Sequence, residues 1–213
     1  MPKRPPPNAP GRPKDPEKRA AILAAAKALF PARGYEGTRM DAIARAAGVS
    51  KLTVYSHFQD KDTLFVAAVR ERCDELMPSG LFLPRVEGSP RDQLVAIAHA
   101  FFRLITSPEA VTMHRMMCVQ LPAGSHLPQL FWEAGPRQVC DALAAFLRGQ
   151  HEAGRLRVPD PTLAASQFFC LLKGEYHARQ TCGYPLQWGP DDVDRHVNAT
   201  VDLFVRAHAP LRE

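Results

Sequence analysis

Three consecutive residues, Lys51, Leu52 and Thr53, carry side chains that can contact a DNA duplex. The Lys51 ammonium can donate to the acceptors of guanine or to a phosphate, and the Thr53 hydroxyl can bond a base edge or a phosphate. The Leu52 side chain can meet the methyl group of thymine. For the three to act together, a rigid element must present them side by side.

Two short helices joined by a tight turn are expected to hold these side chains in place. Thr38 is a favourable N-cap for the first helix, and Asp41 stands at its third helical position, where a carboxylate can reach back in a variant of the capping box. Gly48 suits the positive φ at which a helix ends, and Ser50 is expected to cap a second helix over residues 51–57. This arrangement is typical of a helix-turn-helix, whose second helix reads the major groove.

Further residues extend this candidate interface. Ser50 and Thr38 stand at expected helix N-termini, where amides and hydroxyl groups favour an anion such as a phosphate. Residues 1–14 contain six prolines and four basic residues, so we expect a disordered basic arm. The Gly-Arg-Pro run around Arg12 is similar to arms that place an arginine in a narrow minor groove, and the alternative is a solubilising tail.

The positive charge of the chain is concentrated near its N-terminus. The net charge is +5, but residues 1–61 contain 12 Lys and Arg against 5 Asp and Glu, whereas the remainder contain 15 against 17. A basic N-terminal third on a nearly neutral body fits a protein that binds a polyanion such as double-stranded DNA. The alternative is a solvated basic surface.

Several other classes of protein are disfavoured. No apolar run reaches the roughly 18 residues that span a bilayer, and the basic N-terminus has no apolar signal region, so we expect a cytoplasmic protein without membrane contact. The five cysteines are scattered and form no CxxC pair, so we expect no disulfide framework, no metal and no cofactor. Neither a glycine-rich phosphate loop nor a zinc-protease motif nor a nucleophile–base pair indicates an enzyme.

The segment from Asp15 to Leu76 resembles the TetR family of bacterial transcriptional regulators. The resemblance rests on the runs AAILAAAKALF, GYEGT, IARAAGVS and VYSHFQDKDTLF, which occur in the order and spacing of that family. It implies a three-helix DNA-binding domain, a connecting fourth helix, and a helical domain that binds a ligand and forms a dimer. It also implies contacts to backbone phosphates for Tyr55, His57 and Lys61.

The whole chain is predicted to be all-α, with neither strand alternation nor a repeat. The first helix starts at Asp15-Pro16 and is expected to end or kink early, because Pro31 departs from the family pattern and removes an amide donor. A later segment forms one helix or two interrupted near Gly135. The predicted organisation is a disordered arm over residues 1–14, a helix-turn-helix domain over 15–61, and a helical ligand-binding and dimerisation domain over 62–213.

Residues 108–180 resemble the C-terminal domain of AefR-like regulators of the TetR family, through the runs FWEAGPRQV, LAAFL, GRLRVPDPTLAASQFF and LLKGE. A helical body can bury a small apolar or aromatic effector between its helices. His99, His114 and His177 are candidates for polar contacts, and their spacing does not suit a metal. The candidate pocket residues, each with ordinary core packing as its alternative, are Phe102, Met113, Met117, Phe131, Trp132, Phe168 and Tyr176.

The last two long helices resemble the dimerisation pair of the family, which packs against its mate as a four-helix bundle. A twofold homodimer would present two reading helices to a near-palindromic operator, and a ligand that favours another head separation would weaken DNA binding. Repression is the family habit. The candidate interface residues, which could instead close the core of the monomer, are Phe168, Leu172, Val197, Val201 and Phe204.

Two alternative functions are weighed against this one. A DNA-binding thiol redox sensor would need an exposed thiolate of low pKa, whereas Cys118, Cys140 and Cys170 are expected to be inert core residues within helices. A helical interaction protein that does not bind DNA would lack the steep fall of DNA affinity with salt that phosphate contacts impose.

Overall fold

The computed structural model describes residues 15–83, 88–119, 121, 124–184 and 187–210. Every regular element in these ranges is a helix and none is a strand, which confirms the all-α prediction. No single helix among them is long and apolar enough to cross a membrane. Two consecutive helices, over residues 90–106 and 108–118, would together be long and apolar enough, but they are bent by 65° relative to each other. The elements are α1 (Pro16–Gly37), α2 (Met40–Ala46), α3 (Lys51–His57), α4 (Lys61–Leu76), the 3-10 helix η1 (Ser79–Phe82), α5 (Pro90–Thr106), α6 (Pro108–Val119), α7 (Leu127–Ala134), α8 (Pro136–Glu152), α9 (Pro161–Thr181) and α10 (Pro190–Ala207).

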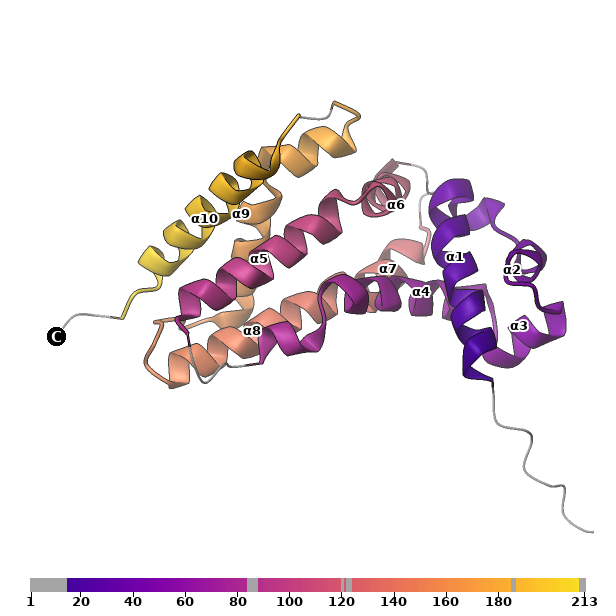
Figure 1. The fold of residues 1–213 in the computed structure, drawn as a ribbon, viewed down its shortest axis with the longest axis horizontal. Coiled ribbons are helices and arrows are strands. Elements are labelled where there is room, and N and C mark those ends of the chain that lie inside the picture. The colour runs from indigo at the N-terminus through magenta and orange to yellow at the C-terminus, as the bar shows by residue number, and fades with distance from the viewer. Residues whose placement is uncertain (1–14, 84–87, 120, 122–123, 185–186, 211–213) are drawn as a thin grey trace, which may run out of the picture.

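Helices α1, α2 and α3 form a head at one end of the molecule (Figure 1). Their apolar faces meet the first half of α4 in one core, in which Ile22, Ile43 and Val54 have no exposed surface. The rings of Phe30 and Tyr35 pack edge-on against Phe65 of α4, with centroids 5.2 and 5.4 Å away. Because a single residue of α3 is buried in this core, the helix is held from one side and its other faces stay exposed.

α1 kinks before its end, as the sequence predicted, but the kink lies at Gly34 and not at Pro31. The helix continues through Pro31 and leaves helical geometry at Gly34, whose φ of 71° suits glycine. Phe30 and Tyr35, on either side of Pro31, both pack against Phe65 of α4, which favours continuation of the helix past the proline. Thr38 was wrongly predicted to cap α2, which begins at Met40 after Arg39 without a side-chain cap. The buried Thr38 hydroxyl instead donates to the carbonyl of Gly34 at 2.7 Å, so Thr38 closes α1.

Other helix starts follow their local signals. Asp15, Ser50 and Asp60 each accept a hydrogen bond from an amide in the first turn of α1, α3 and α4, respectively. Ser89 forms a capping box at the start of α5. These caps satisfy amides that have no partner within the helix, and they fix where each helix begins.

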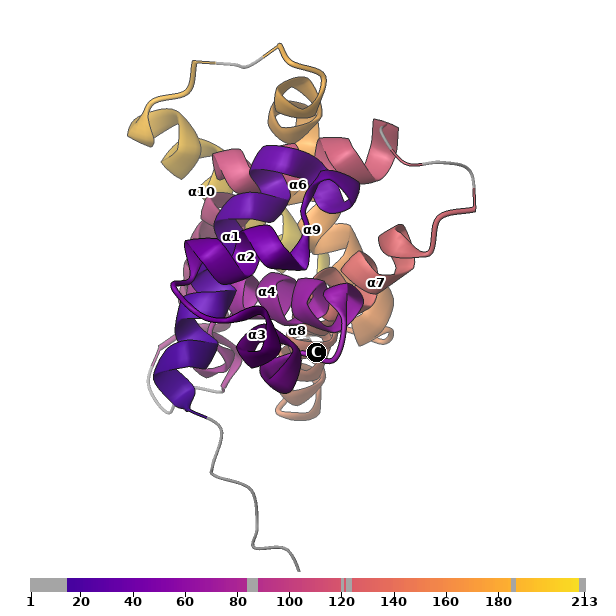
Figure 2. The ribbon, with the colours of Figure 1, turned by 90° about the vertical axis from the view of Figure 1, so that its right-hand side faces the viewer.

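The body surrounds α5, and α4 joins it to the head (Figures 1 and 2). α4 contacts α1 in the head and both α5 and α7 in the body, while α5 packs on α9 and α10. The residues predicted to form a dimer interface lie inside this core, because the apolar faces of α9 and α10 turn toward α5. They therefore close the monomer, and none of them is more than 3% exposed: Phe168, Leu172, Val197, Val201 and Phe204.

Two glycines in the body occupy positions that disfavour a side chain, one for lack of space and one for its positive φ. Gly135 separates α7 from α8, and a Cβ atom there would lie 2.6 Å from Sγ of Cys73 on α4. Gly174 interrupts α9 with a φ of 46°. Near this break the Leu172 carbonyl accepts a hydrogen bond from Nε2 of His196 at 2.9 Å, which ties α9 to α10. The sequence left open whether one helix or two surround Gly135. The structure has two helices, because the backbone of Gly135 leaves helical geometry, with φ −136° and ψ −69°.

Candidate nucleic-acid interface and ligand cavity

The N-terminal end of α3 is exposed and well supported. Val54 anchors the helix in the head, and Oγ of Ser50 accepts a hydrogen bond from the Thr53 amide at 3.1 Å. Lys51 and Leu52 point away from the core, and Leu52 leaves 81% of its surface open to solvent. Neither side chain contributes to the packing of the head, so both are free to contact a partner.

Lys51 is joined to the neighbouring helix by an ion pair. Its Nζ lies 2.8 Å from a carboxylate oxygen of Asp41 on α2, and this hydrogen bond raises the pKa of Lys51. Asp41 thus ties α2 to α3 and does not reach back to cap α2. Exposed pairs contribute little to stability, so Lys51 can exchange this carboxylate for a phosphate or a base acceptor at small cost.

The residues with phosphate contacts implied by the family resemblance differ in their freedom to move. Tyr55 is 42% exposed, and His57 is partly buried. The ammonium of Lys61 donates to the carbonyl of Tyr35 at 3.0 Å and lies 4.1 Å from the centre of its ring. Lys61 therefore ties the start of α4 to the end of α1, and a phosphate would share or replace these contacts.

One predicted DNA-contacting residue is buried in the head, and another cannot be compared with the structure. Thr38 has no exposed side-chain surface, because its hydroxyl is bonded inside the head, so the structure does not support a contact with phosphate. Arg12 lies outside the described residues. Ser50, by contrast, is exposed at the start of α3, as expected.

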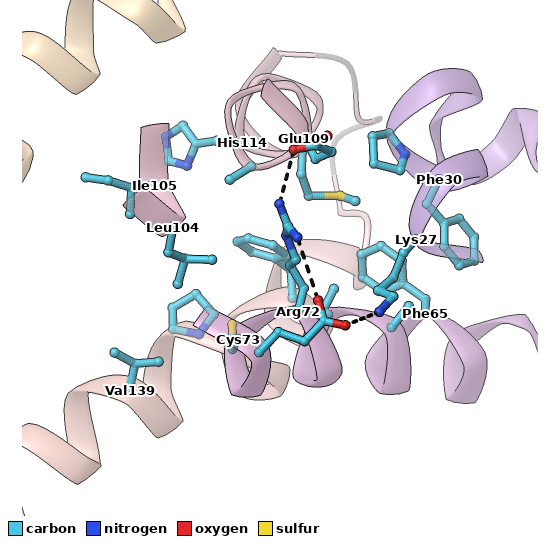
Figure 3. Close-up of a pocket in the computed structure, with 18 of the residues that line it drawn as sticks. Lys27, Phe30, Phe65, Arg72, Cys73, Leu104, Ile105, Glu109, His114 and Val139 are labelled. Carbon is cyan, nitrogen blue, oxygen red and sulfur yellow. Dashed lines mark hydrogen bonds and ion pairs between the residues drawn. The ribbon is translucent and has the colours of Figure 1, made fainter. Parts of the chain in front are cut away.

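A cavity of about 420 Å³ lies where the head meets the body (Figure 3). Helices α1 and α4 form one side of it, and α5 to α9 form the other. Much of the wall is apolar, with Phe30, Phe65, Phe101, Leu104 and Phe131 among the residues that line it. Small-molecule sites in proteins have volumes of roughly 300–1,000 Å³, so a compact organic ligand fits this space.

A chain of ion pairs runs along one wall of the cavity. Lys27 on α1 pairs with Glu71 and Glu75 on α4, with 2.8 Å between Nζ and Glu71. Arg72 on α4 pairs with Glu75 at 3.6 Å and with Glu109 on α6 at 3.3 Å. Figure 3 shows the pairs that cross from Lys27 to Glu109. They connect α1, α4 and α6 across the junction of head and body.

Another part of the wall carries nitrogen groups. His114 on α6 and His177 on α9 have ring centroids 5.0 Å apart, and Lys173 on α9 also lines the cavity. Burial, His114 and Lys173 lower the pKa of His177 to about 4, and burial with Lys173 lowers the pKa of His114. Both imidazoles are therefore neutral near pH 7. His99, the third histidine expected in the pocket, lies instead 3.5 Å from Asp194.

The structure brings part of the predicted pocket to this cavity. Met113 and Phe131 line it. Phe102 and Tyr176 instead pack against each other at 5.3 Å between ring centroids, in an aromatic cluster with Trp188. That cluster joins α5, α9 and the start of α10, so the two residues take the packing role that the sequence left open.

Three other predicted pocket residues also lie elsewhere. Met117 is partly buried beside the core of the head, Phe168 is fully buried in the core of the body, and Trp132 is 49% exposed. Sequence reasoning missed Lys27 and Arg72, because it looked for the pocket within the body alone. Charged residues beside the apolar faces of α1 and α4 were the available signal.

The cysteines lie in two kinds of environment. Burial raises the pKa of Cys73 to about 11 and also raises the pKa of Cys140, which disfavours a reactive thiolate at either position. Cys118 and Cys170 are exposed, so the expectation that they belong to the core was wrong. Both lie on outward faces of their helices, which the apolar pattern alone did not distinguish.

The outer surface of α9 and α10 carries exposed apolar side chains. Leu163 and Leu171 on α9 are 53% and 42% exposed, and Leu203 on α10 is 49% exposed. Leu171 and Leu203 line a shallow depression together with Cys170. These leucines are exposed, whereas the core residues named from the sequence on the same two helices are buried.

Comparisons with known proteins agree with this architecture. Residues 22–68 match the family described as bacterial regulatory proteins of the tetR family, and residues 92–210 match the C-terminal domain of AefR-like transcriptional repressors. The HTH-type transcriptional regulator RutR of Escherichia coli O157:H7 is 32% identical over 146 residues, 68% of this chain and 66% of that protein, just under two thirds of its length. The HTH-type transcriptional activator FasR of Mycolicibacterium smegmatis is 39% identical over 89 residues, 42% of this chain and 41% of that one.

Solved structures share the complete fold. A TetR-family transcriptional regulator from Mesorhizobium loti superposes with a TM-score of 0.77 at 26% identity, covering 93% of this chain and 99% of that one. The flavonoid-responsive regulator FrrA superposes with a TM-score of 0.73 at 29% identity, covering 93% and 100%. The family matches span both the head and the body, so the chain belongs to the TetR family of bacterial transcriptional regulators.

Proposed function

We propose that this protein regulates transcription by binding an operator in double-stranded DNA through α3. The exposed N-terminal end of that helix carries the proposal, because Lys51 and Leu52 project from it without contributing to the core. Lys51 would bond a guanine or a phosphate, Leu52 would meet a thymine methyl, and Thr53 would bond a base edge or a phosphate. The docking follows the helix-turn-helix pattern, in which the N-terminal residues of the second helix contact base edges.

Phosphate contacts would flank this base-reading end. Ser50 at the start of α3 and Tyr55 are exposed and would bond the DNA backbone, and Lys61 would do so from the start of α4. His57 and the arm residue Arg12 remain predictions of the same interface. The concentration of basic residues over residues 1–61 supports a polyanionic partner. Binding would take place in the cytoplasm, at the nucleoid.

The active species would be a homodimer. Exposed leucines on α9 and α10, namely Leu163, Leu171 and Leu203, offer an apolar surface that a second copy would cover. A twofold axis through this surface would give two reading helices and a near-palindromic operator. The spacing of the half-sites would then be set by the distance between the two heads.

A small organic effector would control the affinity for DNA from the cavity. FrrA, a structural relative, is described as flavonoid-responsive, and a more distant one, FadR of Bacillus subtilis, was solved in complex with stearoyl-CoA. A ligand in this cavity would contact α1, α4 and the body together, so it would favour one head position over another. A coupling of about 1–3 kcal/mol would change operator affinity about 5- to 150-fold. Repression relieved by the effector is the expected sense of regulation.

Fluorescence anisotropy with a duplex from the DNA upstream of its own gene tests this function. The wild-type protein should bind with an affinity that falls steeply as salt rises, because each phosphate contact releases counterions. Lys51→Ala should reduce the free energy of binding by about 1–3 kcal/mol. Leu52→Gly should reduce the preference for thymine at one position of the duplex by a similar amount. Arg148→Ala, on the exposed outer face of α8, removes an equal charge away from α3 and should leave binding unchanged.

Two results would contradict the proposal. Absence of binding to every duplex at low salt would exclude DNA as the partner. Equal effects of Lys51→Ala and Arg148→Ala would show that binding depends on total charge and not on α3.

A further inference from the structure

The charged residues that line the cavity do not balance one another. Lys27, Arg72, Glu75 and Glu109 are linked by ion pairs along one wall. Lys173 of α9 also lines the cavity and has no ion-pair partner among the described residues. An unpaired ammonium beside a largely apolar wall favours a ligand that brings a negative charge.

His177 adds a hydrogen-bond donor without a partner. Its side chain is 8% exposed and lines the cavity, and its ring nitrogens form no hydrogen bond with a described residue. The lowered pKa keeps the imidazole neutral near pH 7, with one N–H that can donate. The ring of His114 lies 5.0 Å away, and its Nε2 is 3.5 Å from Sγ of Cys118. Two imidazoles and an ammonium therefore meet with no carboxylate paired to them in the described part of the chain.

The remaining wall is suited to hydrocarbon. Phe101 and Leu104 from α5, Met113 from α6, Phe131 from α7 and Val139 from α8 surround the rest of the volume. These side chains offer no charge or strong hydrogen-bond donor, so an apolar group placed against them gains free energy by leaving water. The cavity thus has a small basic part and a larger apolar part.

From this division we propose that the cavity binds an apolar monocarboxylic acid, whose carboxylate lies at Lys173, His177 and His114 and whose hydrocarbon lies against the apolar wall. The inference rests on the proposed effector role of this cavity. The carboxylate accepts hydrogen bonds from the ammonium and the imidazole, and its charge is complementary to that of the ammonium. A neutral ligand leaves the ammonium without a partner, and a cationic ligand is repelled by it.

The volume of about 420 Å³ requires a compact acid. A medium-chain fatty acid and a fused-ring aromatic acid share the necessary chemistry, and decanoate and 2-naphthoate represent the two. Decanol and decylamine keep the decyl chain and change only the head group. An acyl thioester has no free carboxylate, so this site favours the free acid over its thioester.

Isothermal titration calorimetry on the full chain without DNA tests the proposal with these four probes. Decanoate, 2-naphthoate or both should bind at least about tenfold more tightly than decanol, and decylamine should bind more weakly still. The stronger of the two acids shows whether a chain or a ring fills the apolar part. Titration of operator DNA with the same protein sample reports separately on the proposed function.

Matched variants locate the carboxylate. Lys173→Met and His177→Phe should each weaken binding of the better acid at least about tenfold, while decanol binding changes less than about twofold. Arg148→Met removes a cation from the exposed face of α8 and should leave acid binding unchanged. Thermal unfolding confirms that each variant is folded, and Lys173→Gln serves as a second variant if Lys173→Met is not.

The outcomes distinguish failure of the carboxylate site from failure of the proposed regulatory function. Two outcomes would overturn the carboxylate site alone. In the first, the protein binds DNA but neither acid. In the second, Lys173→Met, Lys173→Gln and His177→Phe leave acid binding intact. Acid binding that these variants weaken, in a protein that binds no DNA, would overturn the regulatory function and support the site. Decanol binding as tightly as decanoate would show that the cavity selects apolar surface and not charge.

Discussion

Replacement of His177 by phenylalanine should make the folded protein less sensitive to acid. His177 is buried beside the cavity, and burial together with His114 and Lys173 lowers its pKa from 6.5 to about 4. In the unfolded chain the same imidazole takes up a proton near pH 6.5. Between these pH values the unfolded state therefore binds more protons than the folded state, and the free energy of unfolding falls as the pH falls.

The size of the effect follows from the two pKa values. His177 stabilises the folded state fully above about pH 6.5, and the contribution is lost progressively as the pH falls to about 4. A change of one pKa unit corresponds to about 1.4 kcal/mol, so lowering the pH from about 7.5 to about 4.5 removes up to about 2.5 kcal/mol through this residue. His114 titrates in the same direction and stays in the variant.

Urea unfolding of the wild-type protein and of His177→Phe at these two pH values measures the effect. The free energy of unfolding of the variant, relative to wild type, should rise by about 2 kcal/mol on going to the lower pH. His99→Phe, which removes a histidine beside Asp194 outside the cavity, should show no such gain. Equal protein concentrations are needed, because a dimer gains apparent stability with concentration.

A parallel loss of stability in the wild-type protein and in His177→Phe would refute the reasoning. It would mean that the imidazole is hydrated or charged in the folded state.

Three further perturbations test other parts of the structure. Thr38→Val leaves the Gly34 carbonyl without its hydroxyl donor and should lower the free energy of unfolding by about 1–3 kcal/mol, measured by urea unfolding; a neutral result would remove the closing role of this residue. Gly135→Ala places a Cβ atom 2.6 Å from Sγ of Cys73 and should lower the free energy of unfolding by about 1–3 kcal/mol. Adding Cys73→Ala to this variant should restore part of that loss, and an additive effect of the two substitutions would contradict the clash. If the protein forms the proposed dimer, Leu203→Arg should shift it toward monomer in sedimentation, because the substitution charges the exposed face of α10; an unchanged dimer would place the interface elsewhere.

The sequence alone determined the features that depend on local chemistry. The limits of α3 and the helix starts at Asp15 and Ser50 were predicted because a cap acts within one turn of its helix. The exposure of Leu52 followed from the same short pattern. The all-α class followed from apolar residues at helical spacing along most of the chain.

The tertiary structure decided which partner covers each apolar face. Helical spacing marked Phe168 and Val201 as apolar, but it could not show that α5 covers them and that Leu203 faces outward. Pairings such as Thr38 with Gly34 depend on how the chain turns between helices.

The residues that line the cavity could be identified only from the tertiary structure. Lys27, His114 and Lys173 come from α1, α6 and α9, so no spacing along the chain brings them together. Their environment, and with it the charge balance of the site, exists only once the head rests against the body. The spacing of apolar residues indicates which face of a helix is buried. It does not indicate which residues of other helices lie opposite that face, and a binding site depends on both.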